Sequence, residues 1–354
     1  MVKRQQESDA TARPQPSRTP SCPQRKRYAQ DTRDVDVDPE VMDDPLRAIC
    51  LDLGFFTRAH ARAAGFDDRA VTKEARAGRW FRIRRGYYTF PDIWSSSTEE
   101  QRHLMRCRAV LDSLGDDVAL SHTSACVAQR IAVWGLPLDR VHVTRLDGGA
   151  GRIEGDVVHH EGFVADHEVG MVDGMRVLAP ARCVLEAGTL GTPESALVCL
   201  NSALHRRRCG LQDIGAQFDL MAHWPRVRHL HVPVRMCTDK AESVGESRGL
   251  WLFWTQNLPA PTLQFEVHDR GELVGRTDWG WPRLRGLGEF DGKVKYGRLL
   301  KPDQDPGEVV FKEKQREDRL REVTGAWMVR LVWSDLSEPA RTAQRLRRLM
   351  SAAS

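Results

Sequence analysis

The feature that most constrains this chain is the stretch from Thr277 to Lys293 near its C-terminus, which holds three acids and a lysine. Two of the acids, Glu289 and Asp291, lie in a short segment bounded by glycines. Alternate side chains of a β-strand share a face, so Glu289 and Asp291 would project together with Lys293 while Phe290 packs on the other side. Charges crowded on one face of a short strand are costly unless something compensates them. A divalent cation such as Mg²⁺ does so, because it binds a few carboxylate oxygens and keeps several waters. The stretch therefore favours a strand that carries a cation site.

The length and charge of the chain set the scale of its organisation. At 354 residues it exceeds one ordinary core, so two or three domains are expected. The net charge of +4 is modest, but arginines gather locally within 79–85 and at 206–208. Such basic runs indicate contact with a polyanion more than the total charge does.

The cysteines and the apolar segments bear on the compartment. Eight cysteines occur without a Cys-x-x-Cys pair. Four of them lie inside apolar helical patterns and are expected to be small core residues in a reducing environment: Cys107, Cys126, Cys183 and Cys199. No stretch is apolar and long enough to cross a bilayer, and the N-terminus lacks the apolar segment of a secretion signal. A cytoplasmic location is expected.

The first 44 residues are rich in Arg, Gln, Ser, Pro and Asp and have almost no apolar periodicity. Such a segment cannot bury enough surface to offset the entropy lost on ordering, so residues 1–44 are predicted to form a disordered tail. The tail is either a solvated leader or a basic arm that touches nucleic acid.

A small helical module is expected after the tail. From Pro45, apolar residues recur at helical spacing, Thr57 can cap a short second helix, and Asp67–Asp68 can begin a third. Two β runs around a basic turn come next, within 80–90. Helix, tight turn, helix and β-wing is the order of a winged helix-turn-helix, which we expect over residues 45–92.

The chemistry of this module assigns it a DNA-binding surface. The helix that begins at Asp67–Asp68 would face a major groove while Val71 and Ala75 face inward, and the wing would add further cations. The expected DNA-contacting residues are Arg69, Thr72, Lys73, Arg76, Arg82, Arg84 and Arg85. The alternative is a module whose arginines are merely solvated, or one that binds protein.

Residues 93–239 alternate helices and short strands, so a middle α+β region is expected. His122 opens a helix within Ser121–Ala125 without a nucleophile and a partner motif beside it, so a capping or core role is predicted. His159, His160 and His167 could bind a metal. Strand and loop histidines without a compact ligand pattern usually do not, so a structural role is predicted for them.

Residues 240–354 are predicted to form a mixed sheet flanked by helices, in the order α-β-β-β-α-β-α. The expected elements are a helix from Ser243, a strand over 261–267, a second strand up to Asp278, a strand over 287–291, a helix over 313–324, a strand over 327–333 and a final helix capped by Ser337.

This order resembles the PD-(D/E)XK nuclease superfamily, and within it the domain related to very-short-patch-repair endonucleases. The matching segments are Glu246 in a Glu-Ser-Arg helix, Asp278 in Arg-Thr-Asp-Trp-Gly-Trp-Pro, residues 289–292, and residues 316–320 with the strand over 327–333 after them. The resemblance covers the last third of the chain. It implies an α/β domain that hydrolyses phosphodiester bonds in DNA with Mg²⁺.

The resemblance also implies a role for each matching residue. Asp278 would be the central Mg²⁺ ligand, Glu289 or Asp291 the second, and Glu246 an outer one. Lys293 would orient or help deprotonate the attacking water, which makes Asp278, Glu289, Asp291 and Lys293 the expected catalytic residues. Gln315 and Arg316 would contact phosphate. The strand offers both Glu-x-Asp and Asp-x-Lys registers, so the choice of acid pair stays open.

One departure from the repair endonucleases changes what can be transferred. Where they carry histidines after this strand, the chain has Lys293, Lys295 and Tyr296, so a histidine-assisted mechanism does not carry over. The alternatives are a nuclease-derived domain that binds DNA without cutting it, or an acidic strand held by ion pairs to Arg276 and Lys293.

A second resemblance concerns residues 45–92, which look like the winged-helix N-terminal domain of AbiEi-family antitoxins. It is carried by Phe56-Thr57-Arg58 and by Arg84-Arg85-Gly86-Tyr87-Tyr88, and residues 121–125 and 172–177 are similar to the segment C-terminal to that domain in many actinobacterial proteins. AbiEi antitoxins repress their own operons by binding DNA. The resemblance implies double-stranded DNA as a partner and, for an antitoxin-like chain, a cognate toxin; a homodimer is also expected.

The sequence thus predicts a multidomain α+β protein that binds DNA and carries an Mg²⁺-dependent endonuclease domain. The alternative is a non-enzymatic transcriptional regulator, or an AbiEi-type antitoxin repressor, in which the nuclease fold is a relic.

Overall fold

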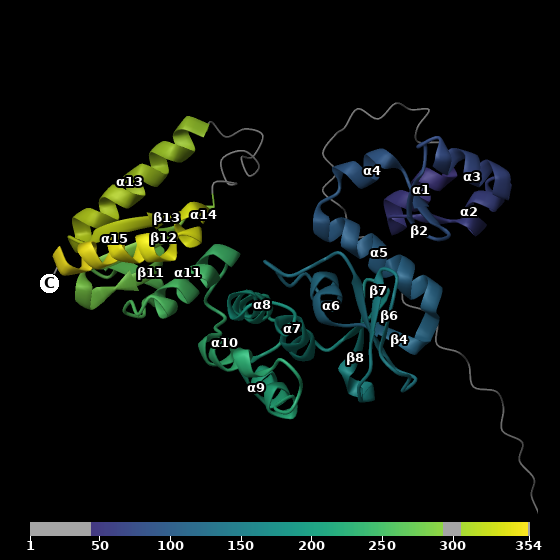
Figure 1. Cartoon of the computed structure of the whole chain (residues 1–354). Helices are drawn as coiled ribbons and strands as arrows, with labels where there is room; N and C mark the ends of the chain where they lie inside the picture. The colour runs from purple at the N-terminus through teal and green to yellow at the C-terminus, as the bar shows by residue number, and fades with distance from the viewer. Residues whose placement is uncertain (1–43, 293–305, 353–354) are drawn as a thin grey trace, which may run out of the picture. The chain divides into compact units, whose positions relative to one another are not determined.

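The computed structural model describes residues 44–292 and 306–352 (Figure 1). The predicted tail, apart from Asp44, and Lys293 therefore lie outside the described residues. The described part contains three separate sheets, each accompanied by helices, which agrees with the predicted multidomain α+β class. The boundaries proposed between the domains stay predictions.

The first sheet belongs to a small helical module near the N-terminus. Its elements are α1 (Pro45–Leu53), β1 (Phe56–Thr57), α2 (Arg58–Ala63), α3 (Asp68–Arg76), β2 (Phe81–Arg84) and β3 (Tyr87–Thr89). Thr57 Oγ1 accepts a hydrogen bond from the His60 backbone at 3.2 Å, and Asp67 Oδ1 accepts one from the Ala70 backbone at 2.7 Å, so both predicted caps are present. The strands lie in the order β1-β3-β2, and the rings of Phe56 and Trp80 pack edge to face in the core.

The second sheet forms the middle region together with a group of helices. Its elements are α4 (Pro91–Ser96), α5 (Glu99–Leu114), β4 (Val118–Leu120), α6 (His122–Ala128), β5 (Val141–Arg145), β6 (Arg152–Glu154), β7 (Val157–His160), β8 (Val169–Val172), β9 (Met175–Leu178), α7 (Pro180–Gly188), α8 (Pro193–His205), α9 (Leu211–Leu220) and α10 (His231–Met236). The strand order is β6-β7-β5-β4-β9-β8. The pairs β5/β7 and β4/β9 are parallel, and the other pairs are antiparallel.

Small side chains let the helices of the middle region pack closely. Cys107, Cys126, Cys183 and Cys199 are completely buried free thiols within its hydrophobic core, as predicted from their apolar surroundings. Burial raises the pKa of the Cys107 thiol to about 12, so the thiol is inert toward ionisation.

The third sheet lies in the C-terminal part. Its elements are α11 (Val244–Thr255), β10 (Thr262–Asp269), β11 (Glu272–Trp281), β12 (Gly286–Phe290), α13 (Pro306–Thr324), β13 (Trp327–Leu331), α14 (Trp333–Ser337) and α15 (Pro339–Ala352). The strands lie in the order β10-β11-β12-β13, antiparallel except for the parallel pair β12/β13. This is the mixed sheet predicted from the element order, with one additional short helix, α14.

Close contact between α11 and the sheet depends on two glycines one helical turn apart. A Cβ atom on Gly249 would lie 2.4 Å from Cζ2 of Trp279, and one on Gly245 would lie 2.0 Å from Cε1 of Phe290. Trp279 is fully buried. The glycines therefore allow the helix to reach the aromatic side chains of the sheet.

Several predicted boundaries differ from the structure. The strand expected to end at Asp278 continues to Trp281, because its last residues pair with β12 from Trp279↔Gly288 to Trp281↔Gly286. The strand expected over 327–333 ends at Leu331, because Asp335 Oδ2 accepts the Val332 backbone N–H at 3.0 Å and begins α14. The helix expected from residue 313 begins at Pro306.

Within the described residues, none of the helices combines the length and apolar character that crossing a membrane requires.

Candidate functional site

A row of cations runs along one face of α3. Arg69, Lys73 and Arg76 are exposed, whereas Val71 is completely buried. Residues spaced by three and four along a helix lie on the same side, so these three side chains form one basic face. Thr72 shares this face, but it is half-buried and its hydroxyl donates to the Asp68 carbonyl at 2.8 Å. The face therefore presents charge more than hydroxyl groups.

The cations of this basic face differ from neighbouring arginines in whether they form ion pairs. Arg62 pairs with Asp68 at 2.8 Å, and Arg79 pairs with Glu74. No ion pair joins Arg69, Lys73, Arg76, Arg82 or Arg85 to the described part of the chain. Their charge is thus available to an external anion.

The segment predicted to be a wing consists of β2, β3 and the turn between them. Arg82 and Arg85 are exposed, as expected of cations that would reach DNA. Arg84 is half-buried, with its Cζ 6.0 Å from the centre of the Tyr87 ring. The register shifts between Arg82 and Arg84, which breaks the simple alternation that would have exposed both side chains. This segment therefore offers two exposed cations and one that packs against an aromatic ring.

The predicted acids of the C-terminal sheet lie on neighbouring strands. Asp278 on β11 is one step beyond the pair Trp279↔Gly288, which places it opposite Glu289 on β12. The Asp278 Oδ2 atom accepts the Phe290 backbone N–H at 2.7 Å. The sheet thus brings Asp278 and Glu289 to one place.

Arginines compensate much of the charge of these acids. Arg316 from α13 pairs with Glu289, which is buried, and Arg330 from β13 lies 3.6 Å from Glu289 and 3.8 Å from Asp291. The alternative of an acidic strand held by ion pairs named Arg276 and Lys293. Arg276 pairs with Glu242 at 3.0 Å and not with the strand, and Lys293 lies outside the described residues. Strand pairing explains the difference, since Glu289 lies beside Arg330 in the parallel register of β12 and β13.

Glu246, Gln315 and Lys293 were also predicted for this site, and they differ in their surroundings. Glu246 is buried at the start of α11, where it accepts hydrogen bonds from Ser243 Oγ at 2.7 Å and Gln264 Nε2 at 3.0 Å. Burial raises the pKa of its carboxyl. Gln315 is exposed on α13, and Lys293 lies outside the described residues.

Within residues 44–292 and 306–352, Asp278, Glu289 and Asp291 do not form a group of three side chains that could hold a metal ion together. Mg²⁺ can be held by one or two carboxylates and waters, so Mg²⁺ at this place stays a prediction.

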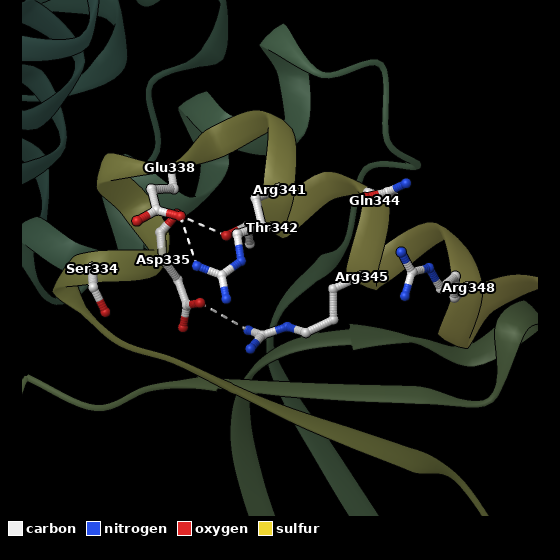
Figure 2. A pocket seen from close by; sticks show the side chains of 8 residues that line it. All are labelled: Ser334, Asp335, Glu338, Arg341, Thr342, Gln344, Arg345 and Arg348. Atoms are coloured by element: carbon white, nitrogen blue, oxygen red, sulfur yellow. Dashed lines mark hydrogen bonds and ion pairs between the residues drawn. The ribbon is translucent and has the colours of Figure 1, made fainter.

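A polar hollow of about 380 Å³ lies against α14 and α15 (Figure 2). Figure 2 shows Arg345 reaching toward Asp335, at 3.2 Å, and Arg341 pairs with Glu338 at 3.0 Å. Arg348 also lines the hollow, so its lining holds three arginines and two acids, and two of the arginines are paired with those acids.

A larger cavity of about 940 Å³ lies in the middle region, and the sequence did not indicate it. His122 and His160 line it with Arg182 and Glu186, whose side chains pair at 2.8 Å. Behind them lies His142, a residue that no sequence motif singled out. Burial lowers the pKa of His142 to about 3 and that of His160 to about 4, so both imidazoles are neutral at physiological pH.

Part of the N-terminal module that carries the basic face matches a known protein family. Residues 51–91 match the family described as "Transcriptional regulator, AbiEi antitoxin", so this segment carries an AbiEi-type antitoxin transcriptional-regulator domain. The chain is also similar to two proteins of Mycobacterium tuberculosis, the uncharacterized protein MT2308 of strain CDC 1551 and the uncharacterized protein Rv2248 of strain H37Rv. Each is 28% identical over 237 residues, which cover 64% of this chain and 81% of the relative.

Proposed function

We propose that the chain is a DNA-binding transcriptional regulator that contacts double-stranded DNA through α3 and the turn between β2 and β3. The observation that carries the proposal is the face of Arg69, Lys73 and Arg76, which lack ion-pair partners in the described part of the chain and lie inside the segment that matches a regulator family. The order of the elements in residues 45–89, with sheet order β1-β3-β2, supports a winged helix.

Each part of this surface has a role in the proposed complex. The basic face of α3 enters the major groove, where arginine and lysine contact phosphates and base edges. Arg82 and Arg85 on the wing contact the adjacent backbone. The Asp67 cap and the buried Val71 fix the rotation of α3, so the same three side chains always face outward.

DNA binding is tested by fluorescence anisotropy with DNA from upstream of the chain's own gene and with shuffled DNA, at several salt concentrations. Arg69→Ala and Lys73→Ala should each weaken binding and lower the slope of log K against log salt by about 1, because each removes one phosphate contact. Arg228→Ala removes the same charge from an exposed site in the middle region and should leave binding unchanged. Absence of salt-dependent affinity, or an equal loss in all three variants, contradicts the proposal.

The family match also brings a partner into the proposal. A regulator of the AbiEi antitoxin type is expected to act beside a cognate toxin, and the DNA-bound form is proposed to be a homodimer. Co-expression with the product of an adjacent gene, with size-exclusion chromatography and light scattering of the purified material, tests both. A stable complex or a dimer supports the corresponding partner.

A second function, endonuclease activity, is favoured by the placement of Asp278 and Glu289 on adjacent strands of the mixed sheet. The test is nicking of plasmid DNA in the presence of Mg²⁺. Asp278→Asn keeps an acceptor for the Phe290 backbone N–H but removes the charge, so it should abolish nicking. Asp269→Asn makes the same chemical change at the far end of β10 and should not. Equal nicking by all proteins, or none, rules the activity out.

A further inference from the structure

The sheet of the middle region places two histidines on one face. Thr144 of β5 pairs with His160 of β7, so His142, two residues before Thr144, shares the face of His160. The Nδ1 atom of His142 lies 2.9 Å from the Nε2 atom of His160. His159 is adjacent to His160 in sequence and therefore lies on the opposite face.

A third histidine reaches the same place from α6. The His122 ring stacks on the His160 ring with centroids 3.7 Å apart, and the Ser121 backbone N–H donates to the His142 carbonyl at 3.0 Å. His122 has a φ of 48°, in the left-handed region that costs energy for a residue with a side chain. Strain of this kind persists where the surroundings demand one position of a side chain.

Together the three rings form a compact set of donors. One ring nitrogen from each of His122, His142 and His160 lies within 4.8 Å of the other two. Among the residues that the structure describes, these histidines are the group of three possible metal ligands whose donor atoms lie close together. Imidazole nitrogen is a preferred ligand of zinc, nickel and copper ions.

The group that orients His122 is also present. The Nδ1 atom of His122 lies 3.0 Å from Ser121 Oγ and 3.4 Å from Glu186 Oε2. Glu186 is held in turn by Arg182 at 2.8 Å. A carboxylate beside the second nitrogen of a metal-binding histidine fixes the ring and strengthens the ligand, and it leaves Nε2 of His122 to face the ion.

We propose that His122, His142 and His160 bind a divalent transition-metal ion of the zinc type, with Glu186 positioning His122. In a tetrahedral zinc site the ligand nitrogens lie about 3.3 Å apart. The His142–His160 pair is already close to that separation. His122 stacks on His160, so ion binding requires the His122 ring to turn toward the shared point. His122 and His160 line the cavity of about 940 Å³, so the fourth position of the ion faces open space where water or a small ligand can bind.

The proposal is tested on the full chain after removal of metals with a chelator. Zn²⁺ is titrated by calorimetry, Co²⁺ is added as an optical probe, and bound metal is measured by mass spectrometry after gel filtration. One equivalent of metal per chain and the visible absorption bands of tetrahedral Co²⁺ are expected. Binding of less than about 0.2 equivalents by the unaltered protein overturns the proposal.

Matched variants separate this site from adventitious binding. His142→Asn and His160→Gln should each reduce affinity at least about 100-fold, and Glu186→Gln should reduce it about 10-fold to 100-fold. His159→Gln changes the neighbouring histidine on the opposite face and should bind normally. Equal loss in His159→Gln, or full binding by His142→Asn, overturns the proposal.

Folding of the variants is monitored separately by circular dichroism. The unaltered protein should melt at a higher temperature with Zn²⁺ than without it, because an ion that binds the folded state stabilises it. His142→Asn should lose this shift while keeping its spectrum. A shift of equal size in His142→Asn contradicts the proposal.

Discussion

Glu289 and Arg330 occupy paired positions on the parallel strands β12 and β13, with Oε2 of Glu289 3.6 Å from the guanidinium of Arg330. Glu289 is buried and also pairs with Arg316 from α13. The acid that the sequence suggested as a metal ligand is therefore part of a network that joins two strands and a helix.

Removing Arg330 should destabilise the C-terminal part of the chain. Arg330→Met leaves the buried Glu289 carboxylate less compensated, and we expect a loss of about 1–2 kcal/mol in the free energy of unfolding, because Arg316 remains and Arg330 is partly exposed. Urea denaturation measures the change. Arg341→Met, which breaks the exposed pair with Glu338, should cost less than about 0.5 kcal/mol, and equal losses would contradict the role of Arg330.

Gly249→Ala should disturb the packing of α11 on the sheet. Its Cβ would lie 2.4 Å from the buried Trp279 ring, so we expect a loss of about 1–3 kcal/mol. Gly215→Ala on α9 is the control, because its Cβ meets no atom within 4 Å and alanine favours helix. Thermal unfolding should show a lower midpoint for the first variant and an equal or higher one for the second.

Stability should fall on acidification because of His103. This side chain is completely buried, with Nδ1 3.0 Å from the Leu138 carbonyl and Nε2 2.9 Å from Ser124 Oγ. Burial lowers its pKa from 6.5 to about 4.

The unfolded state therefore binds this proton first. The stability that His103 contributes is complete above pH 6.5 and is lost as the pH falls toward 4, by about 1.4 kcal/mol per pH unit. Urea unfolding between pH 7 and 4 measures the slope. His103→Gln should reduce that slope by one proton, and an unchanged slope would refute the assignment.

Asp67→Ala should loosen the N-terminus of α3. Loss of the hydrogen bond from the Ala70 backbone should cost about 1 kcal/mol, whereas Asp67→Asn keeps an acceptor and should cost less. Because α3 carries the basic face, Asp67→Ala should also weaken DNA binding in the anisotropy assay. Unaltered stability in Asp67→Ala would show that the cap is dispensable.

Local patterns in the sequence predicted much of the fold. The caps at Thr57 and Asp67, the outward face of Arg69, Lys73 and Arg76, and the element order of the C-terminal part all depend on spacings within a few residues. Helix and strand periods and capping chemistry act over such short separations in sequence. Boundaries such as the end of β11 at Trp281 depend on the partner strand and were less accurate.

The candidate sites divide in the same way. The sequence by itself determined the basic face, because the turn of a single helix gathers its side chains. Only the tertiary structure decided which arginines pair with Glu289, because the register of β12 against β13 places Arg330 beside it. It also decided that His122, His142 and His160 meet, because strand pairing and ring stacking bring together residues from separate elements. The sequence predicted a structural role for His159 and His160, which are adjacent along one strand and therefore point to opposite faces. The parallel pairing of β5 with β7 brings His142 to His160 instead.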